Sequence, residues 1–380
     1  MIYLLKQYDL DLIEFKITHD ELNQYECNII NFNKQYKHLL PPSVNEDSKS
    51  LLKWIKNRTI PKNRENVDQI LSSLGLNYRD TLGILNICKG LSLNDSYWIV
   101  EKGFKGLFKD YNLYDNKFDK TLSLLAYTGD QNYTNNNRFI SSPEFTTNGM
   151  IKKGWRRLDN KIVLYKAGTS GMSNTGREPY SELYASMIAK KMGLNHVDYT
   201  LSKWKGNVCS RCELFTDINT SFFDMYSYIS NKTIIEVGDY LKELNNNIYD
   251  SFIDMIIFDC LICNEDRHYG NFGLLVDNKT NKPISLAPIF DNGLSLFNYG
   301  TDNDFKDLNK YASTRLSKYD IDFIVLCKKF ITDRQKEQLR KLINFKFNRN
   351  TTYKYNEDKL KAIEEYIQQR VKLFLSFKSN

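Results

Sequence analysis

The sequence predicts an α+β fold of two lobes that follow an N-terminal accessory region. Short strand-like segments surround one helix between about residues 140 and 215, and the chain beyond Thr216 is mainly helical. The first 125 residues show helical and irregular patterns, with Val67–Leu76 as a clear helix. We therefore expect a mostly helical accessory region at 1–125, a small lobe of antiparallel sheet with one helix at 126–215, and a helical large lobe at 216–380.

Length and composition are those of a globular protein with a sizeable core. The chain has 380 residues, of which 41% are hydrophobic and 13% aromatic, enough for two or three packed units. Its formal charge of +7 is spread over 53 basic and 46 acidic residues. This balance suits phosphate-bearing ligands but does not indicate direct nucleic-acid binding.

The amino-terminal run and the cysteines predict a cytoplasmic location. Lys6 and several acids interrupt the first apolar residues, which is not the pattern of a signal peptide. No apolar stretch is long enough to span a membrane, so we expect no membrane partner. The 7 cysteines are an odd number in a long chain, which does not suggest a disulfide framework.

The expected small lobe contains a helix with clear start and stop signals. Pro179 stands near its start, and Gly193 directly follows its last apolar residue, Met192. The pair Asn148–Gly149 predicts a hairpin turn, because both residues tolerate a positive φ. Further strands are expected around the helix, at 162–166, 197–201 and 208–215.

Two helices are expected in the large lobe. The segment from Ile253 to Cys263 is almost wholly apolar and should be buried. The last helix begins at about Asp358 and carries an apolar face that should pack onto the large lobe: Leu360, Ile363, Ile367, Val371 and Phe374.

Two polar loops carry the most informative residues. Asp266 and Asn271 lie directly after the apolar helix and before a strand, and Asp291 follows a second apolar strand after Pro288. Each loop delivers oxygen ligands from between rigid neighbours, so the two can converge on one point.

This layout is the one that phosphoryl transfer requires, because that reaction depends on positioning and charge neutralisation. A carboxylate must orient the acceptor hydroxyl and take its proton, which fits Asp266. An amide oxygen and a second carboxylate must hold Mg²⁺ against the phosphates of ATP, which fits Asn271 and Asp291. Surface placement or helix capping is the alternative explanation of these residues.

The motif Asp266-x-His268-x-x-Asn271, followed by Pro288-x-x-Asp291, resembles the catalytic and magnesium-binding motifs of the HipA family of serine/threonine kinases. Phosphatidylinositol kinases share a similar Asp-Arg-His-x-x-Asn loop. The stretches 142–149 and 178–182 also resemble a HipA-like subgroup, and the likeness covers residues 140 to 300 well. It implies a bilobal protein-kinase-like fold and an ATP- and Mg²⁺-dependent kinase acting on a protein Ser or Thr hydroxyl.

The resemblance also implies roles for residues outside the two loops. Lys166 would contact the α- and β-phosphates, and Glu182 would pair with Lys166 and fix its direction. An ordinary surface ion pair is the alternative for these two. His268 joins the catalytic group, where bracing the loop by a hydrogen bond is favoured over metal binding. The nucleotide-covering turn would consist of Thr146, Thr147, Asn148 and Gly149. The hinge that contacts adenine would consist of Glu213, Leu214 and Phe215.

Partners and alternative functions follow from the same resemblance. ATP and a protein acceptor are expected, together with an antitoxin-like regulatory partner and autophosphorylation at Ser141, Ser142, Thr146 or Thr147. The N-terminal region does not match the small domain that precedes the kinase in HipA toxins, so toxin behaviour is not carried over. Two alternatives stay open: a lipid or small-molecule kinase, and a nucleotide-binding regulatory pseudokinase that acts through its first 125 residues.

Overall fold

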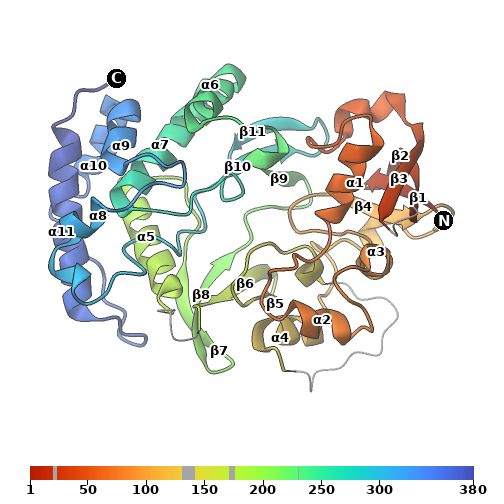
Figure 1. Ribbon diagram of the computed structural model, residues 1–380, viewed down its shortest axis with the longest axis horizontal. Helices are drawn as coiled ribbons and strands as arrows, with labels where there is room; N and C mark the ends of the chain where they lie inside the picture. Colours follow the sequence, from red (N-terminus) through yellow and green to blue (C-terminus); the bar gives the residue numbers. More distant parts are fainter. Residues whose placement is uncertain (20–23, 131–141, 171–175, 230) are drawn as a thin grey trace. The chain divides into compact units, whose positions relative to one another are not determined.

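The computed structural model describes residues 1–19, 24–130, 142–170, 176–229 and 231–380. These residues form two compact units, which are described separately and are coloured along the sequence in Figure 1. The units comprise the following segments: Met1–Lys166, Glu213–Phe223 and Leu275–Ile284 in unit 1; Ala167–Cys212, Asp224–Leu274 and Ser285–Asn380 in unit 2. The expected division at residues 125 and 215 stays a prediction.

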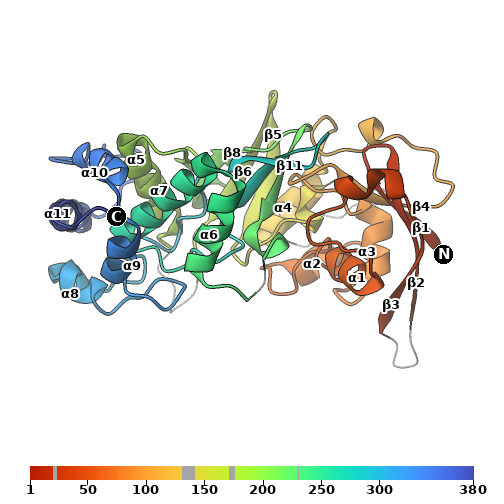
Figure 2. The same ribbon diagram turned by 90° about the horizontal axis from the view of Figure 1, so that it is seen from above.

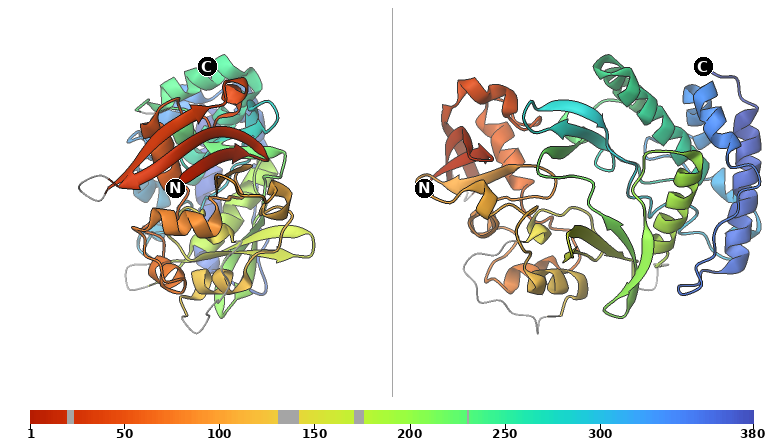
Figure 3. Two further views of the ribbon diagram at one scale, coloured as in Figure 1. Left: turned by 90° about the vertical axis from the view of Figure 1, so that its right-hand side faces the viewer. Right: turned by 180° about the vertical axis from the view of Figure 1, so that it is seen from behind.

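The first residues of unit 1 form three strands: β1 (Ile2–Gln7), β2 (Leu10–His19) and β3 (Tyr25–Phe32). With β4 (Tyr97–Glu101) they make an antiparallel sheet of order β3-β2-β1-β4, which the left panel of Figure 3 shows. In this register Leu5 lies opposite Ile13 on one side and Ile99 on the other. Its central strands therefore meet through buried aliphatic side chains.

The prediction of a mostly helical accessory region was wrong for residues 2–32. Along β1, Tyr3, Leu5 and Gln7 are buried and alternate with the more exposed Ile2, Leu4 and Lys6. A burial period of two belongs to a strand, because successive side chains point to opposite faces. The apolar residues on both faces concealed this alternation in the sequence.

Helices follow the sheet in unit 1. Helix α1 (Ser48–Lys56) contacts β3 and lies beside the sheet in Figure 2. The expected helix from Val67 is confirmed as α2, although it ends at Ser72. The remaining helical elements of the described part of unit 1 are α3 (Thr81–Cys88), α4 (Lys120–Thr128), and the 3₁₀ turns η1 (Lys34–Leu39), η2 (Phe108–Asp110) and η3 (Pro143–Phe145).

The hairpin expected at Asn148–Gly149 was wrong. Pro143 begins the short helix η3 instead, and the strands come later as β5 (Lys153–Leu158) and β6 (Lys161–Ala167). The turn of this antiparallel hairpin contains Asp159, whose φ is 52°. The strand expected at 162–166 is confirmed within β6.

Later segments of the chain form a three-stranded sheet of order β11-β10-β9. Its strands are β9 (Thr220–Asp224), β10 (Gly273–Asp277) and β11 (Lys282–Leu286). The short helix η4 (Met225–Ser227) directly follows β9. Strand β10 begins where the polar loop after the apolar helix ends.

Unit 2 confirms the main helices that the sequence predicts. Helix α5 (Glu178–Met192) ends at Gly193, whose φ of 84° only glycine adopts at little cost. Helix α7 (Asn246–Ile262) is buried along most of its length, and α11 (Glu357–Leu375) buries the expected apolar face. The other elements are β7 (Thr200–Trp204), β8 (Asn207–Glu213), α6 (Ile234–Leu244), η5 (Asp304–Lys306), α8 (Leu308–Ala312), α9 (Phe323–Phe330) and α10 (Asp333–Arg340). Across the described residues, none of the helices combines the length and apolar character that crossing a membrane requires.

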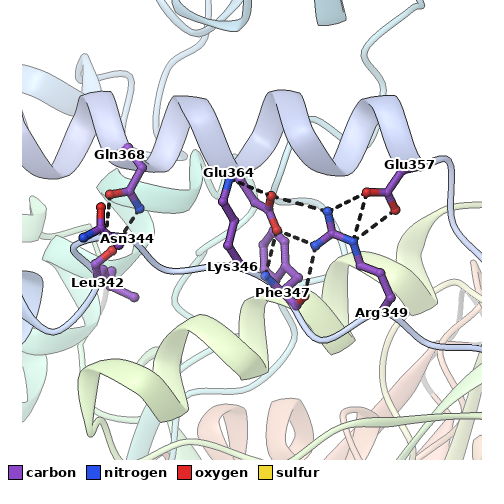
Figure 4. A network of polar contacts seen from close by, with 8 residues as sticks. All are labelled: Leu342, Asn344, Lys346, Phe347, Arg349, Glu357, Glu364 and Gln368. Atoms are coloured by element: carbon purple, nitrogen blue, oxygen red, sulfur yellow. Dashed lines mark hydrogen bonds and ion pairs between the residues drawn. The ribbon is translucent and has the colours of Figure 1, made fainter.

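A buried glutamate attaches α11 to the segment before it, as Figure 4 shows. The Glu364 side chain is 1% exposed, accepts from the Phe347 backbone N–H at 2.8 Å, and binds Lys346 at 3.2 Å and Arg349. Burial alone would raise the pKa of Glu364, but these hydrogen bonds outweigh it and lower the pKa below the ordinary 4.5. The carboxylate is therefore a stabilising group in its charged form.

Replacing Glu364 by Gln should lower the free energy of unfolding by about 1–3 kcal/mol, because charge-assisted hydrogen bonds are lost. Since the folded pKa is depressed, the contribution is complete above the unfolded pKa and is lost as pH falls through the folded pKa. Urea unfolding at pH 7 and at about pH 3 measures both effects. The control is Glu365→Gln, which removes the same charge on the exposed face of α11; a Glu364→Gln loss no larger than that of the control contradicts this account.

Candidate active site

The end of helix α7 positions the first polar loop. Cys263 caps the helix with a left-handed φ of 50°, which turns the chain out of the helix axis. Asn264 then donates from Nδ2 to Asp259 Oδ1 at 2.9 Å and accepts from the Asp266 backbone N–H at 3.1 Å. The start of the loop is thus fixed to the last turns of a buried helix.

Arg267 is the centre of the loop, and its side chain is 1% exposed. Its Nε and Nη2 donate to the two carboxylate oxygens of Asp259 at 2.9 and 3.1 Å. Its Nη1 donates to the carbonyls of Asn271 at 2.8 Å and Phe290 at 2.5 Å, and Nη2 also reaches Asn292 Oδ1 at 2.6 Å. One guanidinium therefore binds α7, the first loop and the second loop together.

The charge of Arg267 is matched within the protein interior. Burial alone would lower the pKa of Arg267, but attraction to Asp259 and the hydrogen bonds with it outweigh burial and raise the pKa above its usual value. The pair is bidentate, the geometry in which a guanidinium and a carboxylate match best. Because both groups are buried, removing one partner would leave an uncompensated charge in the interior.

The expected catalytic residues Asp266, Asn271 and His268 lie together on this loop. Asn271 Nδ2 donates to the Asp266 carbonyl at 2.9 Å, so the amide oxygen Oδ1 is the side-chain atom that can bind a cation. The side chain of Asp266 is 34% exposed, and Lys318 Nζ lies 3.7 Å from its Oδ1. His268 Nδ1 accepts from the Gly270 backbone N–H at 3.0 Å, which braces the loop.

The second loop holds Asp291 in a left-handed conformation with φ of 53°. Its backbone N–H donates to the Tyr199 hydroxyl at 3.3 Å, and the next N–H, of Asn292, donates to Glu182 Oε2 at 2.7 Å. Glu182 is fully buried. The Lys166–Glu182 pairing joins residues of the two units and stays a prediction.

The residues expected around the nucleotide lie in unit 1. A buried Glu144 accepts from the Trp155 backbone N–H at 2.8 Å and pairs with Arg64, which also donates to the Lys153 carbonyl at 3.2 Å. Burial raises the pKa of Glu144 despite the opposing attraction of Arg64. This network attaches η3 to strand β5. Lys166 lies near the end of the neighbouring strand β6, and its side chain is also buried.

Local hydrogen bonds hold the turn that follows η3. Thr146 Oγ1 donates to the Leu91 carbonyl at 2.9 Å, and Thr147 Oγ1 donates to the Pro143 carbonyl at 2.7 Å. The Asn148 carbonyl accepts from Lys153 Nζ at 2.6 Å. Gly149 has a φ of 92°, a conformation that favours glycine. The turn is therefore a defined structure, and its contact with a nucleotide stays a prediction.

The expected hinge residues also lie in unit 1. Glu213 forms an exposed ion pair with Lys161 at 2.5 Å, and the Phe215 ring packs edge-on against Phe222. The backbone N–H of Leu214 donates to the carbonyl of Ile162 at 2.9 Å. An adenine contact at this hinge must therefore use backbone groups other than that N–H.

The side-chain oxygens of unit 2 suit a Mg²⁺ ion that is also bound by the phosphates of a nucleotide. Among the residues that the structure describes, no three His, Cys, Asp or Glu side chains form a cluster that could enclose a metal. Mg²⁺ needs no such cage, because it is held by one or two protein oxygens together with phosphates and waters. Asn271 offers an amide oxygen and Asp291 a carboxylate, and Arg267 Nη1 bonds both to the Asn271 carbonyl and to the residue before Asp291.

The sequence alone did not identify Arg267, Asp259, Asn264 or Asn292 as parts of the site. One signal was available, because Asp259 is an acid within the mainly apolar second half of α7, and a buried charge requires a partner. Arg267 stands within the quoted motif and is the cation nearest to Asp259 in the sequence after it. Asn292 had no comparable signal, since its contact depends on the fold.

Comparisons with known proteins support the expected resemblance. No family model matches the chain. The serine/threonine-protein kinase CtkA of Helicobacter pylori is 30% identical over 135 residues, which are 31% of this chain and 40% of the relative. The match therefore spans less than half the length of this curated relative.

One solved structure supports the fold over almost the whole chain. A chain of the Shewanella oneidensis HipA, HipB and operator DNA complex matches with a TM-score of 0.56 and 12% identity, covering 99% of this chain and 98% of that chain. The H. pylori CtkA structure matches with a TM-score of 0.44 and 17% identity, covering 59% and 93%. The predicted α+β fold and the resemblance to HipA-like serine/threonine kinases are confirmed.

Replacing Arg267 by Met should lower the free energy of unfolding by about 3–5 kcal/mol, because it leaves Asp259 charged and unpaired in the interior. The double variant Arg267→Met/Asp259→Leu should recover a large part of this loss, since both charges are then absent. Urea unfolding of the two single variants and the double variant measures the coupling. Additive losses in the double variant would mean that the pair does not act as one unit.

Proposed function

We propose that this chain, which shares the fold of HipA, is an ATP- and Mg²⁺-dependent kinase that transfers the γ-phosphoryl group to a protein Ser or Thr hydroxyl. The observation that carries the proposal is the set of bonds from Arg267, which joins the loop of Asp266 and Asn271 to the loop of Asp291. Three oxygen-bearing side chains with the chemistry of a phosphoryl-transfer site thus belong to one rigid assembly. The name of the H. pylori relative supports the acceptor class.

Each residue of unit 2 has a separate role in this proposal. Asp266 is partly exposed, so its carboxylate can accept the proton of an incoming hydroxyl and orient it. Asn271 and Asp291 would hold Mg²⁺, which neutralises charge on the phosphates. His268 braces the loop through Gly270 and keeps Asp266 and Asn271 at a fixed spacing.

The nucleotide would be held by residues of unit 1 and by Glu182. Lys166 would contact the α- and β-phosphates, with Glu182 fixing its direction. The turn of Thr146, Thr147, Asn148 and Gly149 would cover the nucleotide, and backbone groups of Glu213, Leu214 and Phe215 would meet adenine. The Glu144 network supports this role, because it gives the turn a defined conformation on strand β5.

Autophosphorylation and a regulatory partner are further parts of the proposal. The hydroxyls of Ser142, Thr146 and Thr147 each make a hydrogen bond, so phosphorylation there would require these bonds to break. Ser141 lies outside the described residues. An antitoxin-like partner is supported by the HipA neighbour, whose structure contains HipB. The seven buried free cysteines are in keeping with a reducing cytoplasm.

A lipid or small-molecule kinase is the second candidate, favoured by the Asp-Arg-His-x-x-Asn loop at 266–271. Radiolabelled ATP offered with protein, phosphoinositide and metabolite acceptors separates the two. Label in protein supports the first candidate, and label in a lipid or metabolite alone supports the second. Magnesium-dependent ATP binding without transfer to any acceptor would indicate the regulatory pseudokinase.

Replacing Asp266 by Ala should lower the rate of phosphoryl transfer by about 10²–10⁴-fold, because the proton of the acceptor hydroxyl then has no carboxylate to accept it. Binding of ATP with Mg²⁺ should stay within about twofold, since Asp266 is not assigned to the nucleotide or the metal. Transfer of label and equilibrium binding of ATP measure the two effects. Asp239→Ala on the exposed side of α6 is the matched control; equal transfer by both variants excludes Asp266 as the base.

Replacing Asp291 by Ala should raise the Mg²⁺ concentration for half-maximal transfer by at least about tenfold, because one ligand is lost. Asn271→Ala should act in the same direction. A titration of Mg²⁺ at saturating ATP measures the shift. Asp277→Ala, an acid at the end of strand β10, should leave the Mg²⁺ requirement unchanged; an unchanged requirement in Asp291→Ala would remove Asp291 from the metal site.

A further inference from the structure

A short hairpin of unit 2 lies beside the proposed catalytic loop. Leu316 and Asp322 form an antiparallel bridge, and the Ser317 backbone N–H donates to the Ile321 carbonyl at 3.0 Å. Ser317 Oγ donates to the same carbonyl at 2.8 Å. Asp322 then caps helix α9 by accepting from the backbone N–H of Ile324. The hairpin 316–322 is therefore a rigid turn that continues into a packed helix.

Tyr319 attaches this hairpin to the catalytic loop. Its ring lies 5.9 Å from the ring of Tyr269, and its hydroxyl is buried without a hydrogen-bond partner among the described residues. The pKa of Tyr319 is raised well above its usual value, first by burial and then by the nearby Asp259 carboxylate. The hairpin thus packs against the same buried assembly that holds the proposed active site.

Lys318, the residue before Tyr319, places its ammonium group close to Asp266, the proposed base. Lys318 Nζ lies 3.7 Å from Asp266 Oδ1, and the Lys318 side chain is 51% exposed. Arg315 makes a matching pair with Glu265, also at 3.7 Å. Pairs between side chains that are one third to one half exposed, at 3.7 Å, contribute little to stability. A structural role therefore does not account for a lysine held against Asp266 by a rigid hairpin.

Open space adjoins this lysine. A surface hollow of about 500 Å³ is lined by Glu265 of the catalytic loop, by Arg315, and by hairpin residues that include Lys318. A hydroxyl that donates to Asp266 would lie about 2.7 Å from the carboxylate, with the reacting phosphorus about 3 Å beyond it. Lys318 Nζ lies 3.7 Å from the same carboxylate on a half-exposed side chain, so it is placed to turn toward a phosphoryl oxygen at that position.

We propose that Lys318 is a further catalytic residue, whose ammonium group contacts the transferring phosphoryl group on the acceptor side of Asp266. The inference rests on the proposed kinase function and adds a cation from outside the catalytic loop. In the step, the acceptor oxygen bonds to the γ-phosphorus while the bond from that phosphorus to the bridging oxygen breaks. The proton of the hydroxyl passes to Asp266, and ADP leaves with the electron pair. Lys318 keeps its proton and stabilises the negative charge on the phosphoryl oxygens.

The test compares Lys318→Met with Arg315→Met in the full chain. Both variants remove one exposed cation that lines the same hollow and pairs with a carboxylate at the same distance. Transfer from radiolabelled ATP is measured with dephosphorylated casein and with the chain itself as acceptors. Lys318→Met should lower kcat by about 100-fold with little change in the affinity for ATP. Lys318→Arg should recover most of the rate, and urea unfolding should show the same stability for all variants.

The outcomes separate this inference from the function on which it rests. A wild-type chain that transfers no label to any acceptor overturns the proposed function and the role of Lys318 with it. A wild-type chain that is active, with Lys318→Met no slower than Arg315→Met, overturns the role of Lys318 alone. A faster Lys318→Met also overturns it, because the lysine would then obstruct the acceptor. A loss that appears only in KM would make Lys318 a binding residue and would contradict contact with the phosphoryl group.

Discussion

The proposed active site depends on one buried ion pair, Arg267 with Asp259. Asp259 is part of helix α7, so the pair connects the catalytic loop to a helix that is almost entirely buried. The remaining donors of Arg267 reach the carbonyls of Asn271 and Phe290, one on each loop. A buried ion pair is a weak source of net stability, because desolvation offsets much of the attraction. Its main effect here is to fix the positions of the two loops, because a planar guanidinium binds five acceptors in fixed directions.

Unit 1 contains a second pair built on the same physical principle. Arg64 binds Glu144 in the interior and also donates to the carbonyls of Glu144 and Lys153. The guanidinium therefore satisfies a carboxylate and two backbone groups where η3 meets strand β5. In both units a buried arginine binds a carboxylate and backbone carbonyls of two separate segments, so it holds those segments together. Such backbone is where functional residues are most often placed.

The sequence predicted the elements that follow from local rules and missed those that depend on distant contacts. Helix α5 carries start and stop signals, α7 a long apolar run and α11 an apolar face, so their approximate positions could be predicted. Strand β1 of the N-terminal sheet was missed because it is apolar on both faces. In β2, buried Ile13, Phe15 and Ile17 alternate with Glu14, Lys16 and Thr18, so a strand signal was available there. Asp266, Asn271 and Asp291 could be selected from their types and positions, and their roles stay predictions. The hydrogen bonds from Arg267 and Glu182 to the second loop connect residues that are far apart in the sequence. No local sequence pattern predicts such contacts.

The backbone conformation of Asp291 explains why the second loop needs several hydrogen bonds from other segments. A residue other than glycine in the left-handed region costs about 1–2 kcal/mol, and it persists only when its neighbours are fixed. Arg267 holds the carbonyl before Asp291, the Tyr199 hydroxyl accepts its own N–H, and Glu182 accepts the N–H that follows. The backbone is thus held at three consecutive positions, which sets the direction of the Asp291 side chain. Glu182 therefore has a structural task in unit 2 whether or not it also orients Lys166, and this accounts for its complete burial.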